Sequence, residues 1–210
     1  MPRFARSCLV VAVVGLALVV LEEPARSQSV QPAAIRLEIQ AGSKAEYRVR
    51  EQLARLNFPN DAVGTTESIT GVIVMRPDGS FAPDSKLTID LRTLKTDEPK
   101  RDGFVRENTL ETNRYPHAEF VPQRQKGMPV PLPASGTANF QLIGALTLHG
   151  VTAEQAWDVA ASFAGETITA KAAARFNFAK YKITVPRIFG LLSVDDDIRL
   201  ELNARMLRRP

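Results

Sequence analysis

The stretch TANFQLIGALTLHG, from Thr137 to Gly150, decides the fold class. Side chains of an extended backbone alternate between two faces, so an apolar residue at every second position marks a β-strand with one buried side. The residues that share the apolar face here are Phe140, Leu142, Leu146 and Leu148. Gly150 then permits the positive φ of a tight turn. The stretch predicts a strand that ends in a turn.

The same alternation recurs along the chain, whereas helical periodicity is hard to find. In KLTIDLRTL, for example, Leu87, Ile89 and Leu91 face one way and the polar residues face the other. The predicted strands cover residues 45–51, 68–75, 86–94, 117–123, 137–150, 154–165, 167–178 and 193–206. A long polar stretch after Thr96 predicts a loop with a short helical turn from Phe104 to Leu110.

Eight consecutive antiparallel strands predict an all-β domain whose sheet closes into a barrel, because closure removes exposed strand edges. A barrel of eight strands is either filled by side chains or holds one elongated ligand. The small residues Ala170, Ala172 and Ala174 on one strand face favour space for a ligand, although a face packed under a loop has the same pattern.

The N-terminal segment differs from the rest of the chain. Arg3 and Arg6 precede an uncharged apolar run from Cys8 to Leu21, which is typical of a secretory signal and short for a membrane span. We expect residues 1–27 to be a signal peptide, 28–42 a lead-in and 43–210 the barrel, in a periplasmic or secreted protein. Cys8 is the only cysteine, so no disulfide or thiolate metal site is expected in the mature domain.

The charge distribution gives no indication of nucleic-acid binding. The 27 basic and 23 acidic residues leave a net charge of +4, and no cluster of Lys and Arg with interleaved aromatics occurs. We expect no nucleic-acid partner.

Four motifs in order resemble the YceI-like family of periplasmic polyisoprenoid-binding proteins. They are LTIDLRTLKTD followed by Arg101 and Asp102, Leu110 with RYPHAEF, GALTLHGVT, and the final SVDDDIRLELNARM. The resemblance spans about Ser43 to Met206. It departs from the family at residues 153–156, where a proline pair is usual, and at Tyr181 and Lys182, a difference that would narrow or repolarise the channel mouth.

The resemblance implies a lipocalin-like barrel that holds a long isoprenoid or fatty chain in an apolar channel and performs no chemistry on it. Burial of each methylene contributes about 0.8 kcal/mol, so apolar walls stabilise such a chain without a polar anchor. We expect the channel to be lined by Leu87, Ile89, Leu91, Phe120, Phe140, Leu142, Leu146, Leu148, Trp157, Phe163, Phe176 and Phe178.

Arg101 and Asp102 are the candidates for contact with a head group, because the fixed donors of a guanidinium suit phosphate or quinone oxygens. The alternative is an Arg–carboxylate pair that pins the long loop. The sequence offers His149 no partners for a metal site or for catalysis as a base. We expect it to hydrogen-bond backbone in its turn. Three consecutive aspartates, Asp195 to Asp197, point alternately to opposite faces and predict a solvated turn.

We therefore expect a non-enzymatic, cofactor-free binding and carrier protein for an isoprenoid quinone, a polyprenyl phosphate or another long-chain lipid. Transient contact with a membrane and formation of a homodimer are both possible on the sequence. One rival is an enzyme acting on a lipid in the same cavity, for which Arg101, Asp102 and His117 would have to converge. The other is a filled barrel that serves as a protein-binding module.

Overall fold

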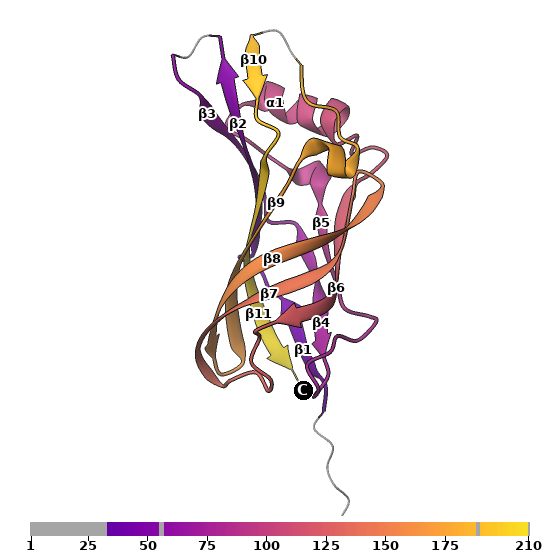
Figure 1. Cartoon of the computed structure of the whole chain (residues 1–210), viewed down its shortest axis with the longest axis vertical. Helices are drawn as coiled ribbons and strands as arrows, with labels where there is room; N and C mark the ends of the chain where they lie inside the picture. Colours follow the sequence, from indigo (N-terminus) through magenta and orange to yellow (C-terminus); the bar gives the residue numbers. More distant parts are fainter. Residues whose placement is uncertain (1–32, 55–56, 188–189, 210) are drawn as a thin grey trace, which may run out of the picture. The chain divides into compact units, whose positions relative to one another are not determined.

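The computed structural model describes residues 33–54, 57–187 and 190–209 (Figure 1). The predicted signal peptide, residues 1–27, lies outside the described residues. The elements are β1 (Ile35–Ile39), β2 (Lys44–Leu53), β3 (Asn60–Thr66), β4 (Ile69–Met75), β5 (Lys86–Asp90), η1 (Leu91–Thr93), α1 (Pro99–Phe104), η2 (Val105–Thr109), β6 (His117–Lys126), β7 (Ser135–Leu148), β8 (Val151–Ala164), β9 (Thr167–Phe176), η3 (Phe178–Tyr181), β10 (Leu191–Val194) and β11 (Ile198–Arg209).

The sheet closes into an eight-stranded antiparallel barrel, as predicted. Its ring runs β1-β4-β5-β6-β7-β8-β9-β11, and the pairing of β11 with β1 closes it. The remaining strands β2, β3 and β10 extend the wall at one end, where β2 pairs with β3 on one side and with β11 and β10 on the other. Figure 1 shows this extension beside α1.

The wall has more than eight strands because some of its strand positions are occupied by two successive strands. β1 and β2 follow each other along the same edge of β11, against residues 206–209 and 199–203 respectively. Ser43 fills the gap between them. It is 2% exposed, its hydroxyl donates to the Gln40 carbonyl at 2.8 Å, and it accepts the Arg205 N–H at 2.9 Å. The hydrogen bonding of the wall therefore continues across the break.

This arrangement corrects the predicted start of the barrel. β1, residues 35–39, lies inside the predicted lead-in of residues 28–42 but pairs with both β4 and β11. Its apolar residues Ile35, Leu37 and Ile39 do alternate with Arg36 and Glu38, so this strand was missed although the signal is present. The predicted strand 193–206 is likewise two strands, β10 and β11, separated by the aspartates 195–197.

The long connection between β5 and β6 contains the predicted helical turn, which begins earlier than expected. α1 starts at Pro99, whose fixed φ suits the first helical position, and η2 continues it to Thr109. Among the described residues, no helix combines the length and apolarity that crossing a membrane requires.

The two ends of the barrel differ in packing. At the end reached by the β8–β9 turn, buried side chains fill the interior; these include Leu37, Met75, Phe163, Ile168 and Met206. At the other end, inward side chains of β2, β5 and β11 surround a cavity. The barrel interior is thus filled by side chains at one end and hollow at the other.

Candidate functional site

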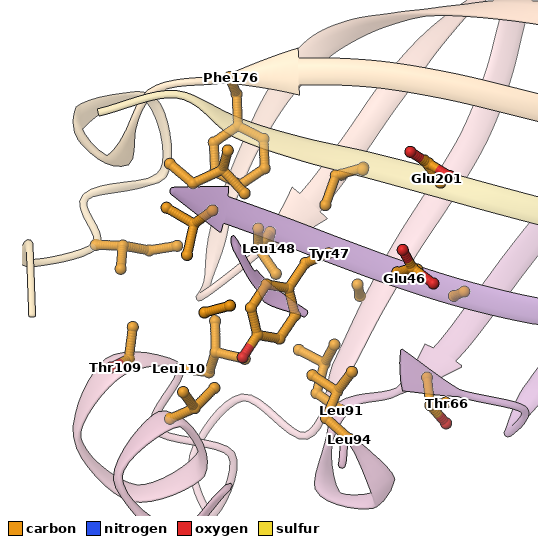
Figure 2. A pocket seen from close by; sticks show the side chains of 18 of the residues that line it. Glu46, Tyr47, Thr66, Leu91, Leu94, Thr109, Leu110, Leu148, Phe176 and Glu201 are labelled. Atoms are coloured by element: carbon orange, nitrogen blue, oxygen red, sulfur yellow. The ribbon is translucent and has the colours of Figure 1, made fainter. Parts of the chain in front are cut away.

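The cavity has a volume of about 770 Å³, within the range of pockets that hold small ligands. Its walls are apolar side chains of β2, β5–β9 and β11, and residues of α1 and η2 cover one side. Figure 2 shows Leu91, Leu94 and Leu110 on one side of this space and Phe176 on the other. An apolar enclosure of this size suits a flexible hydrocarbon chain.

Ten of the twelve residues expected to line a channel do line the cavity. They are Leu87, Ile89, Leu91, Phe120, Leu142, Leu146, Leu148, Trp157, Phe176 and Phe178. Contact of these residues with a lipid stays a prediction.

Phe140 and Phe163 do not line the cavity, and this part of the expectation was wrong. In the strand register Phe140 lies opposite Val159, and Phe163 lies between Gly136 and Ile168. These positions belong to the filled end, where Phe163 is 4% exposed within the core. The alternation therefore identified the correct, inward face of the strand, but it did not show how far along the barrel each side chain lies.

Small side chains on the inward face of β3 occupy little of the barrel interior. The inward positions of β3 are Ala62, Gly64 and Thr66, which face Val49, Tyr47 and Ala45 of β2. Of the alanines in β9, Ala172 lines the cavity, whereas Ala170 and Ala174 are buried in the core cluster. The alanine series thus contributes space at one position.

Trp157 lies in the wall between the cavity and the core. It is 8% exposed, and its ring meets that of Phe120 edge to face, with centroids 6.0 Å apart. It is the only tryptophan of the chain, so tryptophan fluorescence reports on this part of the wall.

Arg101 lines the cavity, but its guanidinium is already paired. It donates to Glu51 Oε1 at 2.9 Å and to Asp97 Oδ1 at 2.5 Å, and its side chain is 16% exposed. Asp102 is not among the lining residues and accepts the N–H and hydroxyl of Thr96, both at 2.7 Å. Arg101 and Asp102 therefore do not pair with each other. Instead, Arg101 ties α1 to β2 through Glu51.

His149 occupies the turn between β7 and β8 with φ +50°, followed by Gly150 at φ +71°. Its Nδ1 lies 3.3 Å from the Tyr181 carbonyl, and its Nε2 lies 3.2 Å from Glu111 Oε1. A hydrogen bond to backbone was expected within the turn itself, whereas this carbonyl belongs to η3, and the contact to Glu111 was not expected. His149 thus joins η3 and the segment after η2 to the barrel wall.

The residues required by the enzymatic rival do not converge. His117 is exposed at the start of β6, where it pairs with Asp90 of β5, and it does not line the cavity that Arg101 lines. Within the described ranges, no three His, Cys, Asp or Glu side chains are grouped to hold a metal ion. Asp196 and Asp197 bond the Phe178 N–H and Arg175, as residues of a turn do.

Sequence reasoning missed the polar groups of the cavity. Tyr47 and Thr109 both line it, and neither was a candidate. Burial raises the pKa of Tyr47 to about 12, although the nearby Arg101 charge lowers it in part. Alternation placed Tyr47 on the same face as Ala45 and Val49, which was the one available signal.

The chain resembles known proteins in sequence and in fold. The family model of the YceI-like domain matches residues 39–206. No curated protein matches the chain.

Three solved structures share the fold. A polyisoprenoid-binding domain from Saccharophagus degradans has a TM-score of 0.63 at 15% identity, covering 83% of this chain and 98% of its own. BcnA from Burkholderia cenocepacia has a TM-score of 0.60 at 18% identity, covering 80% and 98%. A YceI protein from Campylobacter jejuni has a TM-score of 0.55 at 18% identity, covering 70% and 85%.

Proposed function

The chain belongs to the YceI-like family, and from this premise we propose that it binds the hydrocarbon chain of a long isoprenoid lipid in the cavity and carries it. The observation that supports the proposal is the apolar cavity of about 770 Å³ at one end of the barrel. At about 0.8 kcal/mol for each buried methylene, ten methylenes contribute roughly 8 kcal/mol without any polar contact.

The proposed cargo is an isoprenoid quinone or a polyprenyl phosphate, and the similarity to a polyisoprenoid-binding domain supports the isoprenoid tail. The function is binding and transport, with no resident cofactor and no reaction performed on the lipid. Arg101 is the proposed neighbour of the head group because it lines the cavity near Glu51. Asp102 is not retained in this role, since both of its contacts are to Thr96.

The proposed site of action is the periplasm or the exterior, which the signal-like residues 1–27 support. Release of cargo requires transient contact with a membrane. Phe58, which precedes β3, and Leu192 of β10 are 79% and 67% exposed, and such contact would occur at these side chains. A homodimer remains compatible with this role.

Native mass spectrometry of the protein purified from its own host, followed by organic extraction, tests the proposal. We expect one lipid per chain. Ala172→Phe should abolish the bound mass, because Ala172 lines the cavity. Ala173→Phe is the matched control, since the neighbouring Ala173 is exposed on the outer face of β9.

Repeated purification without lipid, together with no affinity for added quinone or polyprenyl phosphate, would overturn the proposal. Equal lipid content in the Ala172→Phe and Ala173→Phe variants would show that the lipid binds elsewhere.

A further inference from the structure

The side chain of His149 faces a hydrogen-bond acceptor through each of its two ring nitrogens. Nδ1 lies 3.3 Å from the carbonyl oxygen of Tyr181, and Nε2 lies 3.2 Å from Glu111 Oε1. A neutral imidazole carries one N–H and donates to one oxygen only, whereas an imidazolium donates to both. In the neutral ring the second nitrogen turns a lone pair toward an oxygen, which is repulsive. The arrangement therefore fits a ring that holds two protons.

The two contacts join three separate parts of the cavity wall, and we call His149, Glu111 and Tyr181 the clamp. His149 stands in the turn between β7 and β8, Glu111 follows η2, and Tyr181 ends η3. Cavity-lining residues lie within three positions of each; they are Leu110, Leu148, Phe178 and Ile183. Figure 2 shows Leu110 and Leu148 at the edge of the cavity. Loss of one clamp contact therefore frees a segment that encloses the cavity.

Unfavourable backbone conformations gather at the clamp. In the part of the chain that the structure describes, three residues other than glycine have a positive φ: Glu111 at +48°, His149 at +50° and Lys182 at +53°. Two of them are clamp residues, and the third follows Tyr181. Such conformations are costly for residues with a side chain and persist where surrounding contacts hold them. Loss of a clamp contact therefore also favours a rearrangement of the segment that it held.

The segment after η2 presents one anionic and one cationic side chain near the ring. Glu111 is 44% exposed and touches His149, whose side chain is 12% exposed, and a carboxylate at this distance attracts an imidazolium. The Tyr115 ring meets the imidazole edge to face, with centroids 4.9 Å apart. The Arg114 guanidinium lies 5.0 Å from the centroid of the Tyr115 ring. The ion-pair contact of His149 on this side is thus the one to Glu111.

η3 and the residue after it carry two cations and one phenol. Lys180 donates to Gln155 Oε1 at 2.8 Å, and Lys182 is exposed to solvent. Burial raises the pKa of Tyr181 to about 12, so its hydroxyl stays neutral in the range in which histidine titrates. The group of η3 that faces the imidazole is therefore an uncharged carbonyl, which accepts a hydrogen bond from a protonated nitrogen.

We propose that the clamp couples retention of the cargo to pH: His149 with two protons holds both segments to the β7–β8 turn, and loss of one proton frees one segment. Because the clamped arrangement holds one proton more than the released one, a lower pH favours retention and a higher pH favours release. This inference rests on the proposed binding of an isoprenoid chain and adds a regulation of the same site.

The test measures the dissociation rate of an isoprenoid quinone by Trp157 fluorescence between about pH 5.5 and 8.5, where histidine ordinarily changes charge. The quinone itself has no group that titrates there. The variant is His149→Asn, because asparagine tolerates the positive φ and does not titrate. His117→Asn is the matched control, since it replaces the second of the two histidines, which is exposed at the start of β6.

We expect release from the wild type to be about three- to tenfold faster at the upper end of this pH range, as the loss of one hydrogen bond predicts. His149→Asn should release the quinone at the same rate throughout, and His117→Asn should behave as the wild type. In lipid-free His117→Asn, where His149 is the remaining histidine, nitrogen NMR should find both ring nitrogens protonated at the lower end and one at the upper end.

Three results would overturn the inference and leave the proposed function intact. They are a release rate of the wild type that is constant or falls with rising pH, a pH dependence that persists in His149→Asn, and a His149 ring with one proton over the whole range. Absence of quinone binding at every pH would overturn the proposed function and with it the control of release.

Discussion

The Tyr47 ring lies against the backbone of Gly64, its cross-strand partner in the β2–β3 pair. A β-carbon on Gly64 would fall 2.1 Å from Cε1 of the ring. Any other residue type at this position would force the ring to move. Gly64 therefore sets the orientation in which the Tyr47 hydroxyl enters the cavity.

Gly64→Ala should destabilise the fold by about 1–3 kcal/mol, because the new methyl overlaps the Tyr47 ring. Gly103→Ala in α1 is the control: a β-carbon at this position would have no atom within 4 Å, and alanine favours a helix over glycine by about 0.5–1 kcal/mol. Urea unfolding of both variants measures the difference. A Gly64→Ala variant as stable as the wild type would mean that the ring moves freely.

Tyr47→Phe should stabilise the lipid-free protein. The hydroxyl is buried without a partner, and its removal recovers a desolvation cost of about 1–3 kcal/mol. Thermal unfolding after organic extraction of the lipid measures the effect, with Tyr115→Phe expected within about 0.5 kcal/mol of the wild type. A destabilised Tyr47→Phe variant would indicate that the hydroxyl is already satisfied in the unliganded protein.

The fold was largely predictable because alternation is a local signal that long strands carry clearly. The breaks in the wall were not, since they depend on distant pairing: Ser43 fills its gap by bonding Arg205, 162 positions away. β10, with four residues and no alternation, becomes a strand through its pairing with β2. β1 is different, because Ile35, Leu37 and Ile39 alternate with polar residues and the missed signal was present.

The sequence predicted which strand face points into the barrel, but not how far along the barrel the cavity extends. Phe140 and Leu142 share an inward face of β7, yet only Leu142 lines the cavity, because the core fills the barrel at Phe140. The ion-pair partner of Arg101 could not be predicted from the sequence either. Its adjacent residue Asp102 bonds Thr96, whereas Glu51, 50 positions away, accepts the guanidinium.

Arg101→Met should cost about 3–5 kcal/mol of stability, because it leaves the Glu51 carboxylate, 9% exposed, without its cation. Arg124→Met breaks a pair with Glu154 whose side chains are 56% and 59% exposed, and should leave the stability nearly unchanged. Chemical denaturation compares the two. Adding Glu51→Gln should restore much of the loss in Arg101→Met; no recovery would show that the guanidinium acts through packing alone.

Stability should fall as the pH rises above 10. Burial raises the pKa of both Tyr47 and Tyr181 to about 12, against an ordinary value of 10.0. Below pH 10 both states keep these protons, so stability is unaffected. Between pH 10 and 12 the unfolded chain releases them and the folded chain does not, which costs up to about 3 kcal/mol per group.

Urea unfolding between pH 9 and 11.5 measures this loss. Tyr47→Phe and Tyr181→Phe should each flatten the decline, and Tyr115→Phe should not. An unchanged slope in both variants would mean that other groups govern the alkaline transition.

His149→Gly should loosen the segments that cover the cavity. Glycine accepts the φ of +50° without strain, so the variant removes the side-chain contacts to the Tyr181 carbonyl, Glu111 and the Tyr115 ring and leaves the turn unstrained. Hydrogen exchange should quicken in residues 105–112 and 178–183 but not in β7 and β8. Ligand release, followed by Trp157 fluorescence, should quicken with it. His117→Ala is the control, because His117 is exposed at the start of β6. Faster exchange without faster release would contradict the premise that these segments retain the cargo.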